Sequence, residues 1–234
     1  MQAEVAATVQ RSSVPTPTGH KSWLRPKYLL FAFIGLMYAY VLWNNESFLF
    51  NHKDPEWPHI ESFKWWLLPH GLAAACALFL GPLQFSDRLR RRFTKLHRVL
   101  GRIYVAGALI GAPLGIYIQR FEEVHSGATR SLTIATVVDA SVWIFATLMA
   151  LAFILQGKVQ QHRQWMTRSF ACAIVFLEVR VISGVFNWDQ FIEIIVWSCV
   201  AAAYPLADFV LYAEELFRSR KAPAKVSLPL VQTG

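Results

Sequence analysis

The stretch Leu132–Leu155, with the sequence LTIATVVDASVWIFATLMALAFIL, decides the fold of this chain. It contains one charged side chain, Asp139, and its other side chains are apolar or small. An α-helix needs about 20 mostly apolar residues to cross the hydrocarbon core of a bilayer. Because lipid cannot hydrogen-bond to the backbone, a crossing segment has to be a helix or part of a closed barrel. The stretch therefore predicts a transmembrane helix.

Five further segments have the same length and apolar character. They are residues 27–46, 65–85, 99–118, 169–187 and 191–213. The composition agrees, since only 16% of the residues are charged and a soluble domain usually has about a quarter. We therefore predict an all-α, polytopic integral membrane protein. Its six-transmembrane-helix bundle would cover residues 27–215, with flexible cytoplasmic tails at 1–26 and 216–234.

Lysine and arginine predict how the bundle is oriented, because cytoplasmic loops of membrane proteins are enriched in both. They cluster after the second segment (Arg88, Arg90, Arg91, Arg92, Lys95, Arg98), after the fourth (Lys158, Arg163, Arg168) and in the C-terminal tail (Arg218, Arg220, Lys221, Lys225). With six spans, all three clusters lie on one side. We expect an N-in/C-in protein of the cytoplasmic membrane.

The net charge of +8 also bears on the binding partners. The basic residues form short clusters beside apolar segments, which favours anionic lipid headgroups over nucleic acid. We expect membrane lipids as partners, a membrane-protein partner as an open alternative, and no nucleic acid.

The third segment carries glycines at four-residue spacing, Gly107, Gly111 and Gly115. Small residues at this spacing lie on one face of a helix and allow a neighbouring backbone to approach closely. We expect this face to be a packing surface.

Four ionisable residues lie in the outer half of the predicted spans: His70, Asp139, Glu178 and Arg180. Charges inside a bilayer are costly, so each one is a functional candidate. Counted from opposite ends of antiparallel helices, Asp139 and Arg180 lie at matching depth, which predicts a pair. The pair could simply set the helix register, or the cluster could bind a proton, an anion or a cofactor.

The predicted inner face carries a second group, because two helices begin with a His-Arg pair that another arginine follows. The residues are His97, Arg98 and Arg102 in one helix, and His162, Arg163 and Arg168 in the other. Histidines from two helices at equal depth could be the axial ligands of the iron of haem b, with arginines near the propionates. Alternatively, His-Arg pairs at the interface bind lipid phosphates and loop carbonyls.

Three expectations accompany the haem hypothesis. Gly101, four residues after His97, would leave room for the macrocycle. Asp208 could be a counter-ion to Arg102 or Arg98. His70 and His125, with His125 in a loop on the outer side, could form a second ligand pair and complete a transmembrane electron path.

The chain has no glycine-rich phosphate loop, H-E-x-x-H or G-x-S-x-G motif.

Several motifs together resemble an uncharacterised family of multi-pass membrane proteins, domain of unknown function 2306 (DUF2306). The motifs are Gly81-Pro82-Leu83-Gln84-Phe85, Leu96-His97-Arg98-x2-Gly101-Arg102-x-Tyr104 and His162-Arg163-x-Trp165-Met166-x-Arg168-Ser169-x-Ala171, together with Arg180. The resemblance covers about residues 30 to 215 and supports a multi-pass topology. It implies no activity. The residues that it implies to be important are His70, Gln84, His97, Arg98, Gly101, Arg102, Tyr104, His162, Arg163, Trp165, Arg168 and Arg180.

Three functions remain open from the sequence. The first is a haem-b-binding transmembrane electron-transfer protein that uses His97 and His162. The second is a non-catalytic scaffold or assembly factor for a membrane complex. The third is a small transporter or intramembrane enzyme that uses the cluster of His70, Asp139, Glu178 and Arg180. Whether the protein is an enzyme stays undecided.

Overall fold

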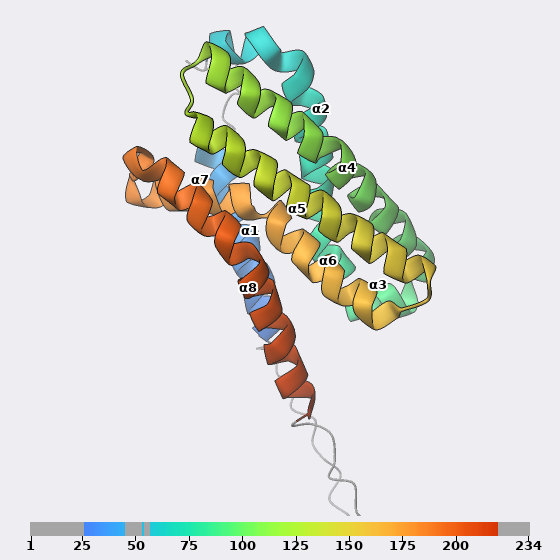
Figure 1. The fold of residues 1–234 in the computed structure, drawn as a ribbon. Helices are drawn as coiled ribbons and strands as arrows, with labels where there is room; N and C mark the ends of the chain where they lie inside the picture. Colours follow the sequence, from blue (N-terminus) through green and yellow to red (C-terminus); the bar gives the residue numbers. More distant parts are fainter. Residues whose placement is uncertain (1–25, 45–52, 54–56, 220–234) are drawn as a thin grey trace, which may run out of the picture.

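The computed structural model describes residues 26–44, 53 and 57–219, and its regular elements in this part are all helical (Figure 1). In chain order they are α1 (Pro26–Asn44), α2 (Trp57–Gln84), α3 (Asp87–Arg92), α4 (Thr94–His125), α5 (Arg130–Leu155), α6 (Val159–Ala173), α7 (Val175–Phe186), the 3-10 turn η2 (Asp189–Phe191) and α8 (Ile192–Ser219). Residues 1–25 and 220–234, in the predicted tails, lie outside this description.

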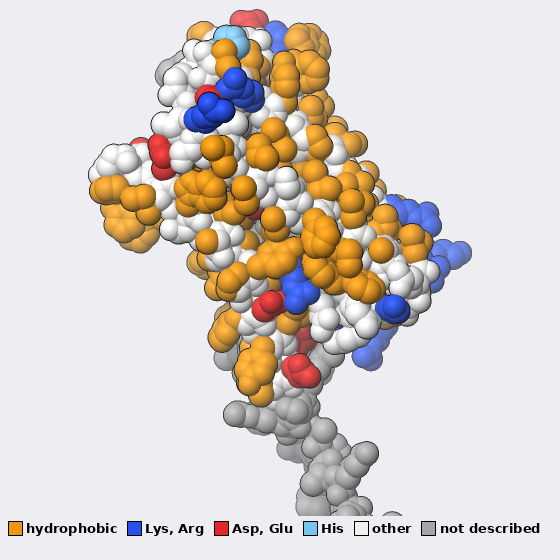
Figure 2. Space-filling view, viewed as in Figure 1, with side chains coloured by type: hydrophobic (Ala, Val, Ile, Leu, Met, Phe, Trp, Pro, Cys, Tyr) orange, Lys and Arg blue, Asp and Glu red, His pale blue; other side chains and the backbone are white. Residues whose placement is uncertain are grey.

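Five helical segments are long and apolar enough to cross a membrane: α2, α4, α5, α6 with α7, and η2 with α8. They confirm five of the predicted segments. The first predicted segment is a shorter apolar helix within α1, Leu29–Asn44. Hydrophobic side chains cover much of the visible face between the ends of the molecule (Figure 2). The protein is a polytopic membrane protein, because exposing an apolar surface of this extent to water would be strongly unfavourable.

The helices form two groups. Helices α2, α4, α5 and α6 pack side by side in a bundle, in which α4 lies between α2 and α5 (Figure 1). Helices α1, α7 and α8 form a flank, with α1 against α7 and α8 against α5, α6 and α7. The flank meets the bundle mainly through α8.

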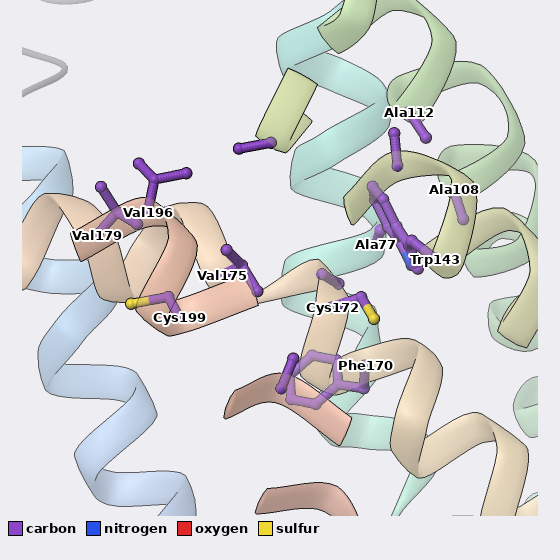
Figure 3. Packing of buried hydrophobic residues seen from close by; sticks show 14 of the residues in the cluster. Ala77, Ala108, Ala112, Trp143, Phe170, Cys172, Val175, Val179, Val196 and Cys199 are labelled. Atoms are coloured by element: carbon purple, nitrogen blue, oxygen red, sulfur yellow. The ribbon is translucent and has the colours of Figure 1, made fainter. Parts of the chain in front are cut away.

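Small residues bring α2 and α4 together, as the glycine spacing predicts. A Cβ atom added at Gly107 would lie 2.6 Å from the carbonyl oxygen of Ala73, and one at Gly111 would lie 3.5 Å from the nitrogen of Ala74. Figure 3 shows Ala77 and Ala108 within this packed region. The helix backbones are therefore close enough that any larger residue at Gly107 would separate them.

A tight hairpin joins the last two spans. Helix α7 ends at Phe186, and Asn187 adopts a left-handed conformation with φ of 53°. Asparagine is among the few residues other than glycine that tolerate this conformation. The chain then enters η2 and α8 directly, so α7 and α8 are antiparallel neighbours.

Four element boundaries differ from the sequence prediction. Helix α3 forms inside the basic loop, where the Ser86 side chain caps it by accepting a hydrogen bond from the nitrogen of Leu89. Helix α8 continues to Ser219, so residues 216–219 are helical rather than part of a flexible tail. His125 is the last residue of α4 rather than a loop residue. The predicted segment 169–187 is divided between α6 and α7 at Ile174.

Candidate functional site

The structure brings together the two histidines that the sequence singled out on one side. His97 lies in the first turn of α4 and His162 in the first turn of α6, and both are half-buried. The two imidazoles are close enough to interact electrostatically. The predicted meeting of the two side chains stays a prediction.

The Nδ1 atom of each ring has a hydrogen-bond partner. His162 Nδ1 lies 2.8 Å from the carbonyl oxygen of Ala150, so it donates a proton there. His97 Nδ1 lies 3.0 Å from the side-chain amide nitrogen of Gln84, in the amide orientation that also lets Gln84 accept from the nitrogen of Gly101. Among the described residues, neither Nε2 atom has a partner.

These bonds determine the tautomers. His162 donates from Nδ1, which leaves a lone pair on Nε2, as a metal ligand requires. His97 accepts at Nδ1 from Gln84, so its Nε2 carries the proton. For His97 to bind a metal through Nε2, the Gln84 amide would have to turn and present its oxygen to an Nδ1–H group.

The space expected beside Gly101 is occupied. A Cβ atom added at Gly101 would lie 3.3 Å from the side-chain amide group of Gln84. The expectation that this glycine leaves room for a macrocycle was wrong for this arrangement, because a side chain from α2 fills the space. Gln84 is the residue that sequence spacing could not place here, although the resemblance implied that it matters.

Two of the inner arginines have partners on α8. Arg168 lies 2.8 Å from Asp208 and stacks on Trp165, and Arg163 pairs with Glu214. The expectation that Asp208 neutralises Arg102 or Arg98 was wrong, because Asp208 meets the arginine of α6. Arg98 and Arg102 are exposed and have no ion pair among the described residues.

The outer histidines do not form a second ligand pair. His70 on α2 lies 2.9 Å from the carbonyl oxygen of Gly111, and its ring fits against Gly115. His125 lies ten residues beyond Gly115 on α4, about 15 Å further along the helix axis. Its ring stacks on Phe121 and faces outward. The predicted pair was wrong because α4 remains helical from Gly115 to His125 and so carries His125 away from His70.

The structure separates the four intramembrane candidates into two electrostatic pairs. Arg180 acts on His70, and Glu178 acts on Asp139. Asp139 is 2% exposed, and Arg180 is exposed. The ion pairs among the described residues do not include one between Asp139 and Arg180. The charged group that contributes to the electrostatics at Asp139 is Glu178 rather than Arg180.

A buried network of hydroxyl groups connects α4, α5 and α6. The Ser169 hydroxyl lies 2.8 Å from the hydroxyls of Tyr104 and Thr147, and all three residues are fully buried. The indole of Trp143 donates to the Tyr104 hydroxyl at 3.4 Å. Sequence reasoning missed Trp143 and Thr147, although their four-residue spacing on one apolar helix was an available signal.

A protein-family model for predicted membrane proteins (DUF2306) matches residues 67–211. The match spans α2 to α8 and includes the two histidines, Gln84 and the buried hydroxyl network. Neither the curated proteins nor the solved structures include a significant match to the chain. Because the family model covers more than half of the sequence, the chain belongs to the DUF2306 family of predicted membrane proteins.

Proposed function

We propose that the protein crosses the cytoplasmic membrane six times and has both ends in the cytoplasm. Helix α1 would be the sixth span, because its 19 residues at about 1.5 Å each extend for about 28 Å. The hydrocarbon core is about 30 Å thick. Its contact with α7 would keep it beside the other spans.

The basic end of the bundle supports this orientation. Helix α3 has the sequence DRLRRR, and its arginines lie beside Lys95 and Arg98 at the start of α4. Lysine and arginine side chains gather at the end of the molecule where α3 lies (Figure 2). Exposed arginines at a membrane surface bind anionic headgroups, which are concentrated on the cytoplasmic side. Membrane lipids are therefore the first partners that we propose.

Cysteine labelling tests the topology. Single cysteines at Arg91 and Gln160, in a variant without the three native cysteines, should react with an impermeant maleimide only after the cells are opened. A cysteine at Ser126 should react in intact cells. Labelling of positions 91 and 160 from opposite sides would overturn the proposal.

For the activity, we propose electron transfer through haem b held between α4 and α6. One observation carries this proposal: His97 in the first turn of α4 and His162 in the first turn of α6 each have an engaged Nδ1 and an Nε2 without a described partner, and a turn of the Gln84 amide would free Nε2 of His97 to act as a ligand. Bis-histidine ligation through Nε2, with Nδ1 held by a second residue, is typical of such sites.

Different residues of the chain would bind the iron, orient the ligands and bind the propionates. His97 and His162 would supply the ligands, and the Ala150 carbonyl and the Gln84 amide would orient the rings. Arg98 and Arg102, which have no described ion pair, would be available for the propionates. Arg163 and Arg168 are engaged with α8, so they would contribute to the site by holding α6 in place.

The absorption spectrum of the purified protein tests this proposal. Protein from haem-replete cells should show a Soret band, with sharp α and β bands after reduction by dithionite. His97→Ala or His162→Ala should abolish the band or shift it, and His125→Ala, which removes an exposed histidine, should leave it unchanged. A colourless preparation with normal folding would exclude haem.

A scaffold or assembly factor is the second candidate, and the ion pairs favour it. Arg163 with Glu214 and Arg168 with Asp208 join α6 to α8, so half of the inner arginines have a structural role. Purification with one stoichiometric membrane-protein partner and without cofactor would support this role over electron transfer.

A small transporter or an intramembrane enzyme is the third candidate. The observation that favours it is the buried Asp139, because acidic residues inside membrane spans usually belong to a functional site.

A further inference from the structure

A groove between α5 and α8 is distinct from the histidine site. It has a volume of about 490 Å³ and is lined by Asp139 and Phe145 of α5, by Trp197 and Tyr204 of α8, and by small aliphatic residues between them. Val138, Phe145 and Trp197 are exposed at its mouth. Both helices are membrane-spanning segments, so the mouth opens towards lipid.

Two polar groups of the groove have no partner among the residues that the structure describes. Asp139 is 2% exposed, and its carboxyl group has no hydrogen bond or ion pair among the described residues. The buried hydroxyl of Tyr204 likewise has no hydrogen-bond partner there. A charged group without a counter-ion is strongly unfavourable in a medium of low dielectric constant. A ligand that satisfies both groups would therefore be stabilised in this groove.

The electrostatics favour a positive ligand. Glu178 is the charged group that acts on Asp139, and it has the same sign. The aromatic rings add to the attraction, since the face of a phenyl, phenol or indole ring attracts cations. Neighbouring side chains hold two of the rings in place. Trp197 donates to the Ser131 hydroxyl at 3.0 Å, and Phe145 packs edge-on against Trp165 with centroids 5.5 Å apart.

The lining also argues against an inorganic cation. Calcium and magnesium need about six oxygen ligands. The groove offers one carboxylate and one hydroxyl among apolar side chains. No group of three or more histidine, cysteine, aspartate or glutamate residues that could hold a metal is present in the described part of the chain. The volume lies in the range of small-molecule sites, about 300 to 1,000 Å³.

We propose that the groove between α5 and α8 binds a lipophilic organic cation, with its charge near Asp139 and its apolar body against Phe145, Trp197 and Tyr204. The ligand would enter sideways from the bilayer, where such cations partition. The site uses none of the residues proposed to hold haem, so the two proposals succeed or fail separately.

Equilibrium binding of radiolabelled tetraphenylphosphonium to the full chain in lipid nanodiscs tests the proposal. We expect saturable binding of one cation per chain. Tetraphenylborate, which has nearly the same size and shape but a negative charge, should not compete. Equal competition by the two ions would show that the groove selects for apolar surface alone and would overturn the proposal.

Substitutions locate the site. Asp139→Asn should weaken binding more than about tenfold, because it removes the charge of a buried pair. Glu193→Gln, which removes an acidic group of α8 outside the groove, should leave binding unchanged. Unchanged affinity in Asp139→Asn would overturn the proposal. If that variant does not fold, Trp197→Leu and Phe145→Leu decide, because each should weaken binding and unchanged affinity in both would refute the site.

Discussion

The bundle and the flank pack by different means. In the bundle, glycine and alanine let α2 and α4 approach to backbone contact, and hydroxyl groups connect α4, α5 and α6. In the flank, Trp197 and Tyr204 of α8 lie towards α5. These large side chains keep the two helices from packing closely and leave a groove between them. A second apolar groove of about 370 Å³ lies between α7 and α8.

The two regions are stabilised by different interactions. Apolar side chains gain little from leaving lipid for protein, so close van der Waals packing and hydrogen bonds stabilise helix pairs in a bilayer. The bundle has both, and it carries the histidine pair at one end. Where α8 of the flank meets α5, the packing is less close and there are fewer hydrogen bonds. The buried Asp139 lies beside the groove at this contact. We infer that the bundle provides rigidity and that α8 provides access from lipid.

The largest expected effect comes from Gly107→Ala, which tests whether backbone contact stabilises the bundle. The new Cβ atom would lie 2.6 Å from the Ala73 carbonyl oxygen, so the helices would have to separate. We expect the free energy of unfolding in mixed micelles to fall by about 1–3 kcal/mol. Gly71→Ala is the matched control, because nothing lies within 4 Å of its added Cβ atom. Equal stability of the two variants would refute the claim that backbone contact at Gly107 stabilises the bundle.

An intermediate effect is expected for Ser169→Ala, which removes the centre of the hydroxyl network. Tyr104 and Thr147 would each lose a bond of 2.8 Å, but each keeps another bond to Trp143. We expect the free energy of unfolding to fall by about 1 kcal/mol. Ser62→Ala removes an exposed hydroxyl and should have no effect. An unfolding midpoint unchanged in Ser169→Ala would mean that the network contributes nothing.

The smallest effect is expected at the contact between bundle and flank. A double-mutant cycle of Arg168→Gln and Asp208→Asn isolates their ion pair, whose carboxylate is about half exposed. Exposed pairs contribute little, so the coupling energy should be about 0.5 kcal/mol. A coupling several times larger would show that α8 is held as firmly as the bundle helices. The cycle is measured by the same unfolding assay.

Much of the candidate site could be predicted because its signals are local. The repeated His-Arg pairs at two helix starts indicated that His97 and His162 lie on one side, and the fold brings them together. The partners could not be predicted in the same way. Gln84 reaches His97 from α2, and Asp208 reaches Arg168 from α8, because the rotation of each helix about its axis decides which side chains meet.

The depth of a residue in the membrane could be predicted for the residues expected in the outer half of the spans, but the rotation of their helices could not. Counting residues placed Asp139 and Arg180 at equal depth, but counting gives no information on which way a side chain points. Helix α6 is interrupted at Ile174, and α7 then presents Glu178 to Asp139. Glu178 and Arg180 are two positions apart on α7, about 200° around the helix axis, so their side chains point to nearly opposite faces and the rotation of α7 decides which one lies on the side of Asp139.

The helical, membrane-spanning character of the chain, the positions of five spans and the close approach along Gly107 and Gly111 could all be predicted from the amino-acid sequence. These properties depend on hydropathy and on residue spacing within one helix, and both follow directly from the order of the amino acids. Only the tertiary structure decided that Gln84 fills the space beside Gly101 and that α5 and α8 leave a groove at Asp139. Both depend on how separate helices are rotated and tilted against one another, and that geometry arises only when they pack.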